Sequence, residues 1–355
     1  MAPQNENTKL HTLNMVYGVL FAVVALFALI ALVVITSRTD TSSQSATVVN
    51  TAPAVDSITA ASATGGAALG TSASGLTLSP RTNAEPSKTT TLFVHGTASD
   101  ANGCTELDNA ASVWRLVVYK STESSGCTAD NNDCYIVSVA GNDTGNLTLG
   151  ATAPGANACD GGTDTQVSYQ MTVPLYYYAD ATDGDASDWN AYLLITDDPA
   201  TPTALIGNST SADFDAKTQT ALNVPSSLAY GTVGLNAESS EATLVVTNAG
   251  NDTTLDTGIK QHATTVGDNL WSCTQGGTFS NSATVGTRWS LTTGTAYASG
   301  TQMLGTNAAT AMSLTKPTTV SGAITATTDD IYLKLKLPAT GYGGSCTSTL
   351  TLTAQ

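Results

Sequence analysis

The chain has 355 residues, and its 28 acidic and 12 basic side chains give a formal net charge of −16 at pH 7. Nucleic-acid binding needs a basic surface, so this composition excludes a DNA- or RNA-binding protein. Only 11% of the residues are charged and 41% are hydrophobic, and the many Thr and Val residues favour strands and turns over helices. The length predicts about two domains.

An apolar run without any charge covers residues 13–36, LNMVYGVLFAVVALFALIALVVIT. As a helix it would rise about 36 Å, which is enough to cross the apolar core of a bilayer. A cleavable signal peptide is the alternative, but its apolar region is usually about 7–15 residues long. The nearest small residues that could be cut, Ser45 and Ala46, also follow an unfavourable Gln44. We therefore predict an uncleaved transmembrane helix whose partner is the lipid bilayer.

The orientation of this helix follows from the cysteines. One basic residue, Lys9 or Arg38, lies close to each end of the run, so flanking charge gives no direction. All six cysteines follow the helix, and an even number without metal-ligand spacing indicates an oxidising compartment. We predict a single-pass protein of the cell membrane, with residues 1–12 as a cytoplasmic tail and the C-terminal domains outside the cell.

A Ser/Thr-rich spacer at residues 37–50 separates the helix from a first domain at 51–215. Trp114, Leu116 and Val118 alternate in its strongest strand pattern, so they share one face. Turn-rich stretches separate its strands, as in a β-sandwich. The predicted strands of this domain lie at residues 91–96, 113–119, 135–139, 167–173 and 189–195.

A second domain is predicted at residues 216–355. Its firmest strand patterns lie at residues 222–224, 242–247, 331–337 and 350–353. The predicted fold class is therefore all-β, with two tandem immunoglobulin-like β-sandwiches after one N-terminal transmembrane helix.

The cysteines are predicted to form structural disulfides. Four lie in the first domain and two in the second, and four cysteines allow three pairings. The segment CTADNNDC is a tight polar loop between two predicted strands, which favours its two cysteines as one pair. No Cys-x-x-Cys or ligand-spaced histidine supports a metal site instead. The predicted disulfides are Cys127–Cys134, Cys104–Cys159 and Cys273–Cys346.

One acidic segment is a candidate calcium site, because Asp180, Asp183, Asp185 and Asp188 lie within a short loop. Calcium prefers several oxygen ligands from a flexible loop. A solvated acidic turn is the alternative, and the absence of an EF-hand pattern favours it. Weaker segments of the same kind are residues 130–133 and 100–102. Calcium is the one cofactor that the sequence suggests.

No enzyme motif is present. The predicted exterior part has two histidines, His95 and His262, on different domains, and it lacks a Gly-x-Ser-x-Gly, P-loop or HExxH motif. Carboxylate pairs for glycoside hydrolysis meet only in space, so sequence does not reveal them. Residues 337–341 match a sortase pattern, but no apolar span or basic tail follows, and a turn between strands is the better interpretation. We predict no catalytic activity.

Two segments resemble hydin-type (ASH-like) immunoglobulin-like modules. They are residues 227–233, SLAYGTV, and 242–251, ATLVVTNAGN, with Tyr230 where the family usually has Phe. Residues 344–353 are similar to the final hairpin of such modules. The resemblance implies an immunoglobulin-like fold for the second domain and says little about a ligand.

The first domain resembles immunoglobulin-like surface domains of prokaryotes. Residues 50–55, residues 96–100 and the Cys127–Cys134 loop carry this resemblance, while the tyrosine corner of antibody domains is missing. It implies a prokaryotic membrane-anchored surface protein with tandem immunoglobulin-like domains.

These features predict a structural or adhesion protein of the cell surface. Envelope polymers, glycans or surface proteins are the expected partners, met through loops or edge strands. One alternative is a pilin-like filament subunit, although Lys9 and Leu10 do not fit a prepilin processing site. The other is a glycan-binding module of a secreted carbohydrate-active protein.

Overall fold

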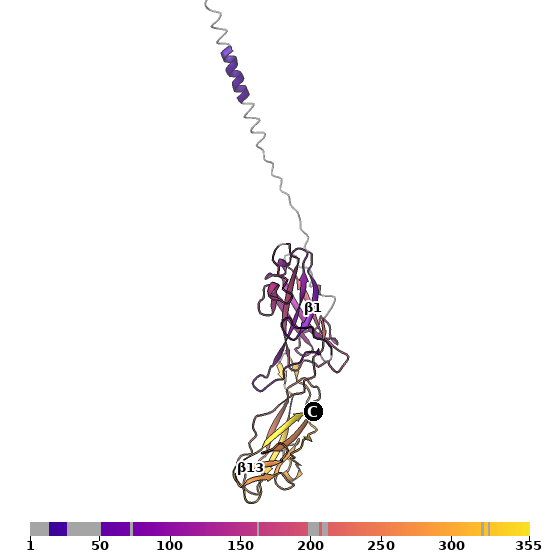
Figure 1. The fold of residues 1–355 in the computed structure, drawn as a ribbon, viewed down its shortest axis with the longest axis vertical. Helices are drawn as coiled ribbons and strands as arrows, with labels where there is room; N and C mark the ends of the chain where they lie inside the picture. Colours follow the sequence, from indigo (N-terminus) through magenta and orange to yellow (C-terminus); the bar gives the residue numbers. More distant parts are fainter. Residues whose placement is uncertain are drawn as a thin grey trace, which may run out of the picture. The chain divides into compact units, whose positions relative to one another are not determined.

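The structure is a computed structural model in which the chain divides into two units, Met1–Val49 and Asn50–Gln355 (Figure 1). Within them it describes residues 14–26, 51–71, 74–161, 163–197, 206–207, 212–320, 323–325 and 327–355. The predicted tail at 1–12 and the predicted spacer at 37–50 therefore lie outside the described residues.

In the first unit, residues 14–26 form a helix whose side chains are all exposed. The rest of the predicted transmembrane segment, residue 13 and residues 27–36, lies outside the described residues. Among the helices that the structure does describe, none is both long and apolar enough to cross a membrane.

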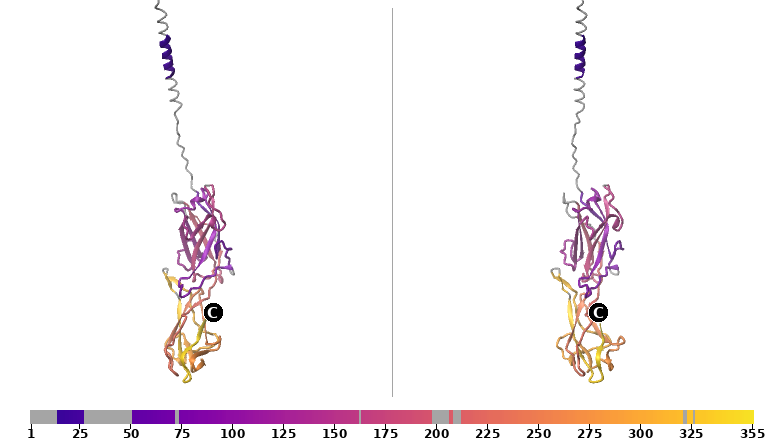
Figure 2. Two further views of the ribbon diagram at one scale, coloured as in Figure 1. Left: turned by 60° about the vertical axis from the view of Figure 1, so that its left-hand side comes forward. Right: turned by 90° about the vertical axis from the view of Figure 1, so that its left-hand side faces the viewer.

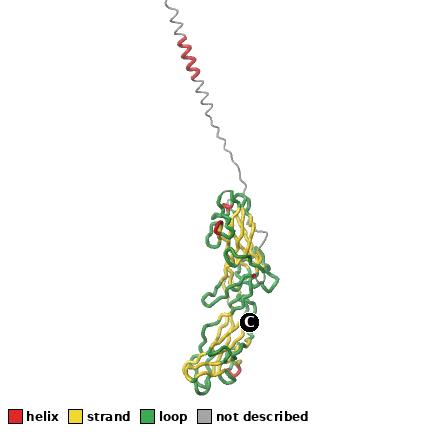
Figure 3. Tube along the Cα trace, in the orientation of Figure 1, coloured by secondary structure: helices red, strands yellow, loops and turns green. Residues whose placement is uncertain are grey.

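The second unit contains two groups of antiparallel sheets, and long loops connect their strands (Figures 2 and 3). We call the group formed by residues 54–214 the first sandwich and the group formed by residues 222–354 the second sandwich. Ala216 still packs in the core of the first sandwich, close to the predicted domain boundary at 215.

The first sandwich has two sheets that face each other across one core. One sheet has the order β1 (Ala54–Ala61), β2 (Thr89–Ser99), β6 (Gln166–Tyr176), β5 (Leu147–Leu149). The other has the order β4 (Cys134–Ala140), β3 (Val113–Lys120), β7 (Trp189–Thr196), β8 (Ile206–Gly207), and β9 (Ala212–Phe214) also pairs with β7. Two short 3₁₀ helices, η2 (Cys104–Glu106) and η3 (Gly150–Thr152), lie in its loops.

All five strands predicted for this sandwich are present, and β6 runs longer than predicted. We expected it to end before Pro174, but it continues to Tyr176. Proline removes a backbone donor, so it fits a strand only where one side is unpaired. At Pro174, β6 pairs with Thr91 of β2, while its other neighbour β5 pairs only with residues 169–171.

The core of the first sandwich combines aliphatic side chains with several buried aromatic rings. Trp114, Leu116 and Val118 share the inner face of β3, as predicted, and none of the three is exposed. The Trp114 ring lies 5.4 Å from the ring of Tyr169 on β6, and its indole nitrogen donates to the Leu107 carbonyl at 3.1 Å. Both sheets therefore bury their inner faces in a single hydrophobic cluster.

The second sandwich is divided into more and shorter sheets. Its largest sheet has the order β10 (Leu222–Asn223), β11 (Ala242–Asn248), β20 (Thr328–Lys336), β15 (Gly286–Ser290), β16 (Thr301–Gln302). Two three-stranded sheets follow, β17 (Ala308–Ala309), β12 (Thr257–His262), β22 (Thr349–Ala354), and β14 (Gly277–Ser280), β13 (Leu270–Gln275), β21 (Gly343–Thr347). A hairpin of β18 (Thr318–Val320) and β19 (Ala323–Thr325) and the 3₁₀ helix η4 (Tyr297–Ser299) complete it.

The strands predicted for this sandwich correspond to β10, β11, β20 and β22, whereas the strands from β12 to β19 were not predicted. Residues 337–341 form the turn between β20 and β21, as expected, and Gly341 adopts the left-handed φ of 89° that this turn requires.

All six cysteines form disulfides, in the three pairings that the sequence predicts. Cys104 bonds to Cys159 and Cys127 to Cys134 within the first sandwich. In the second, Cys273 bonds to Cys346, which lies directly opposite it on the neighbouring strand.

Candidate functional site

The predicted calcium ligands lie in the turn between β6 and β7, and ion pairs occupy two of them. Lys120 Nζ lies 3.3 Å from one oxygen of Asp180 and 3.5 Å from Asp185. The other oxygen of Asp180 pairs with Lys316 of the second sandwich. Asp185 also accepts the backbone N–H of Ser187 at 2.7 Å.

The other two predicted ligands have different surroundings. Asp183 accepts hydrogen bonds from the backbone N–H and the hydroxyl of Thr218, at 3.0 and 2.7 Å. Partial burial, together with the charges of Asp215 and Asp213, raises the pKa of Asp188. Lys120 thus holds Asp180 and Asp185 together, while Asp183 contacts Thr218 instead. Calcium binding by the four carboxylates stays a prediction.

Asp180 belongs to a polar contact between the two sandwiches. Lys316 also donates to the Asn132 side-chain oxygen at 2.7 Å, and burial lowers the pKa of Lys316 to about 8. The buried amide of Asn251 donates to the carbonyls of Ala179 at 2.9 Å and Lys217 at 3.1 Å. Charged and neutral hydrogen bonds therefore link the two sandwiches at this point.

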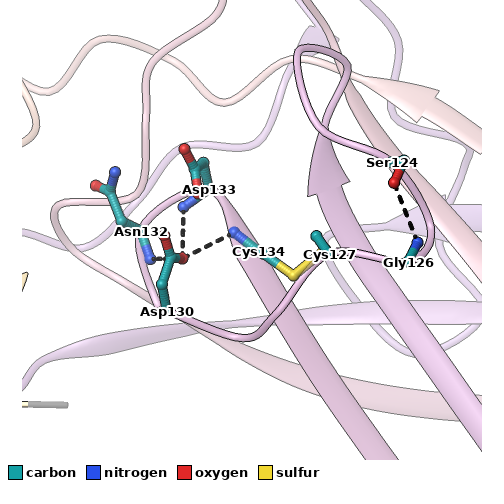
Figure 4. Close-up of a disulfide and its surroundings, with 7 residues drawn as sticks. All are labelled: Ser124, Gly126, Cys127, Asp130, Asn132, Asp133 and Cys134. Carbon is teal, nitrogen blue, oxygen red and sulfur yellow. Dashed lines mark hydrogen bonds between the residues drawn. A yellow bond between two sulfur atoms is a disulfide. The ribbon is translucent and has the colours of Figure 1, made fainter. Parts of the chain in front are cut away.

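The disulfide loop of the first sandwich holds a second pair of acids. One oxygen of Asp130 accepts the backbone N–H groups of Asn132, Asp133 and Cys134, at 2.9, 3.2 and 3.1 Å (Figure 4). Burial opposes ionisation of Asp130, but these hydrogen bonds and one from Asp133 lower its pKa. Burial and the neighbouring Asp130 raise the pKa of Asp133 to about 6. The two carboxyls thus divide into a stronger and a weaker acid.

A third acidic group is formed by residues far apart in the sequence. Asp100 follows β2, Glu106 lies in η2 and Asp197 follows β7. One carboxylate oxygen of each lies within 4.8 Å of those of the other two. Among the described residues, this is the one group of three or more acidic, histidine or cysteine side chains close enough to hold a metal ion together. Burial, and the charge of Asp197, raise the pKa of Asp100. Of these three residues, only Asp100 was singled out from the sequence, in the weaker candidate segment 100–102. Asp197 is almost a hundred residues away in the sequence, and no motif links it or Glu106 to Asp100.

The second sandwich contains a cavity of about 700 Å³. Residues 224–233 form one wall, and within the described chain no backbone hydrogen bond joins this segment to a strand. Polar groups such as Gln261 and Thr347 share the lining with apolar ones. The apolar lining includes Tyr230, Trp271, Leu335, Leu337, Leu350 and Leu352.

His95 and His262 lie in different sandwiches and do not form a common site. His95 lies on β2, where its ring Nε2 is 3.3 Å from the Gly66 carbonyl oxygen. His262 ends β12 in the other sandwich.

Comparisons with known proteins give little further information. No family model matches the chain, and no curated protein matches it. The CupB6 tip adhesin from Pseudomonas aeruginosa is 11% identical with a TM-score of 0.23, over 84% of this chain and 93% of that one. The secreted serine protease VesC from Vibrio cholerae is 11% identical with a TM-score of 0.15, over 81% of this chain and 51% of that one. At these scores neither similarity informs fold or function.

Proposed function

We propose that the chain is a membrane-anchored protein of a prokaryotic cell surface that displays two immunoglobulin-like β-sandwiches in a structural or adhesive role, without catalysis. The observation that carries this proposal is the pairing of all six cysteines in three disulfides. Disulfides persist outside the reducing cytoplasm, so residues 51–355 belong to an oxidising compartment.

The anchor is the apolar run at residues 13–36. Its described part, the helix of residues 14–26, exposes large apolar side chains on all sides, and Met15 and Phe21 are 77% and 78% exposed. Each square ångström of such surface costs about 25 cal/mol in water. An uncharged helix of this kind therefore needs an apolar environment, which a bilayer supplies.

A topology experiment tests this proposal on intact cells that express the full chain. Because the native cysteines are bonded, a membrane-impermeant maleimide reports only an introduced thiol. We expect it to label Thr284→Cys, on an exposed loop of the second sandwich, before lysis. Thr8→Cys, in the proposed cytoplasmic tail, should be labelled only after lysis, and it is the matched control.

Two outcomes would contradict the proposal. Labelling of Thr8→Cys on intact cells would place both ends of the chain on one side of the membrane. Labelling of the native cysteines without a reductant would show that the disulfides do not form in the cell.

A pilin-like filament subunit is the second candidate, because a helix that is apolar on every side would also pack in a fibre core. Negative-stain images of the detergent-extracted chain separate the two functions. Single particles support the display protein, whereas fibres support the filament subunit.

A further inference from the structure

We propose that Asp100, Glu106 and Asp197 form a calcium site at the ends of β2 and β7 in the first sandwich. This inference is independent of the proposed function, because it rests only on side chains within one sandwich.

The spacing of the three carboxylates suits one calcium ion. Calcium binds oxygen ligands at about 2.3–2.6 Å, so two oxygens on the same ion are separated by no more than about 5 Å. The three oxygens here lie within 4.8 Å of one another. They come from two strand ends and a 3₁₀ turn, and a single cation can therefore reach all of them.

The burial of Asp100 gives a second, independent indication. Asp100 is only 1% exposed, and its Oδ1 accepts the Asn102 backbone N–H at 2.7 Å. Its Oδ2 is buried and has no hydrogen-bond partner among the described residues. Burying a carboxylate oxygen without a partner is costly, and Asp197, also 1% exposed, adds like charge beside it. A bound cation would satisfy that oxygen and offset the repulsion.

The surrounding backbone holds the Asp100 turn in place. The Asp100 N–H donates to the Thr165 carbonyl at 2.8 Å, and the Cys104 N–H donates to the Asp164 carbonyl at 2.8 Å. The disulfide from Cys104 to Cys159 ties the same turn to a second loop. A ligand set on such a frame is largely formed before the ion binds, which lowers the entropic cost of binding.

The chemistry of the ligands selects calcium. Three carboxylates are hard oxygen donors, which suit calcium or magnesium rather than zinc or copper. Magnesium requires near-ideal octahedral geometry and retains water, whereas three buried or half-buried loop carboxylates suit the more adaptable calcium shell. The loop of Asp180 differs in this respect, because Lys120 and Lys316 already neutralise its charge.

The test is calcium binding by the purified full chain in detergent. Since only three carboxylates supply the site, we expect weak binding, with a dissociation constant of about 10⁻⁴–10⁻³ M. Calcium at about 10–100 times this constant should raise Tm by about 3–10 °C, and a chelator should reverse the rise. Magnesium at the same concentration should give a smaller rise.

Variants locate the site. Asp100→Asn and Asp197→Asn should each abolish the calcium-dependent rise in Tm. Glu106→Gln, at a less buried position, should reduce this rise, and it provides the test if the other two variants do not fold. Asp185→Asn, in the other acidic loop, is the matched control and should keep the full rise. The proposal is overturned if calcium leaves Tm of the unmodified chain unchanged, or if Asp185→Asn loses the rise while Asp100→Asn and Glu106→Gln keep it.

Discussion

The two sandwiches differ in how completely their sheets cover each other. The first has one continuous core with fully buried aromatic side chains such as Trp114, Trp189 and Tyr169. The second divides its apolar residues between two clusters and retains a cavity of about 700 Å³ beneath the unpaired segment 224–233. The disulfide from Cys273 to Cys346 lies in this more open sandwich. The comparison teaches that the first sandwich combines one shared core with two disulfides, whereas the second combines two smaller clusters with one disulfide. Packing of the core should therefore contribute more to the stability of the first sandwich than to that of the second.

The largest expected effect is on the core of the first sandwich. Trp114→Ala removes a fully buried ring that packs at a tilt against Tyr169, and we expect it to lower the free energy of unfolding by about 3–5 kcal/mol. Leu350→Ala, at the half-buried lining of the cavity, should cost only about 1 kcal/mol. Chemical denaturation of the full chain measures both, and equal losses would refute the comparison.

Removal of the disulfides should follow loop length. In the chain-entropy model, replacing both Cys273 and Cys346 by Ala costs about 4 kcal/mol, because they are 73 residues apart. Replacing Cys127 and Cys134, which are 7 residues apart, costs about 2.5 kcal/mol. Denaturation of the two double variants tests this order. A greater loss for the short loop would show that native packing, rather than loop length, sets the effect.

The unpaired wall of the cavity should open more easily than the paired strands. Amides of residues 226–233 have no backbone hydrogen bonds in the described chain, so hydrogen exchange should label them within the shortest exposure times. Amides of residues 167–173 in β6 should exchange only on global unfolding. Exchange followed by mass spectrometry distinguishes the two, and protection of residues 226–233 would show that the segment pairs with a strand in solution.

The smallest effect concerns pH. The pKa of Asp133 is raised to about 6 in the folded chain, so between about pH 4 and pH 6 the folded state binds more protons than the unfolded state. The contribution of Asp133 to stability is therefore full below about pH 4 and is lost as pH rises through 6. Solvent screening limits it to less than about 1 kcal/mol.

Asp133→Asn should remove this dependence on pH, and Asp160→Asn, at an exposed position of the same sandwich, should retain it. Denaturant midpoints at a series of pH values measure the difference. An unchanged profile in Asp133→Asn would assign the titration to another group.

The same contrast explains which parts of the fold could be predicted from the sequence. In β3 every second residue from Trp114 to Val118, and in β7 every second residue from Trp189 to Ile195, is apolar and buried, so both strands were predicted. In β12 the inward positions are Thr257, Ile259 and Gln261, all buried, and polar residues at inward positions hide the two-residue period. The buried hydroxyl of Thr257 lies 2.6 Å from that of Thr310, a pairing that only the folded chain creates.

The acidic sites show a related limit. Asp180 and Asp185 are close in sequence, which made them candidate ligands, but Lys120 and Lys316 reach them from other strands and loops. Asp100 and Asp197 are remote in sequence, and only the adjacent ends of β2 and β7 bring them together. The disulfides were predictable because the number of cysteines in each domain and the short loop between two of them left few pairings.

The disulfides also determine how the molecule responds to load. If its two ends are pulled apart, residues enclosed by a bonded pair of cysteines cannot extend. At about 3.5 Å per residue, the 55-residue separation of Cys104 and Cys159 withholds about 190 Å of contour length. The 73-residue separation of Cys273 and Cys346 withholds about 250 Å. A tethered chain of this design would therefore lengthen less, once its sheets part, than the same chain without these disulfides.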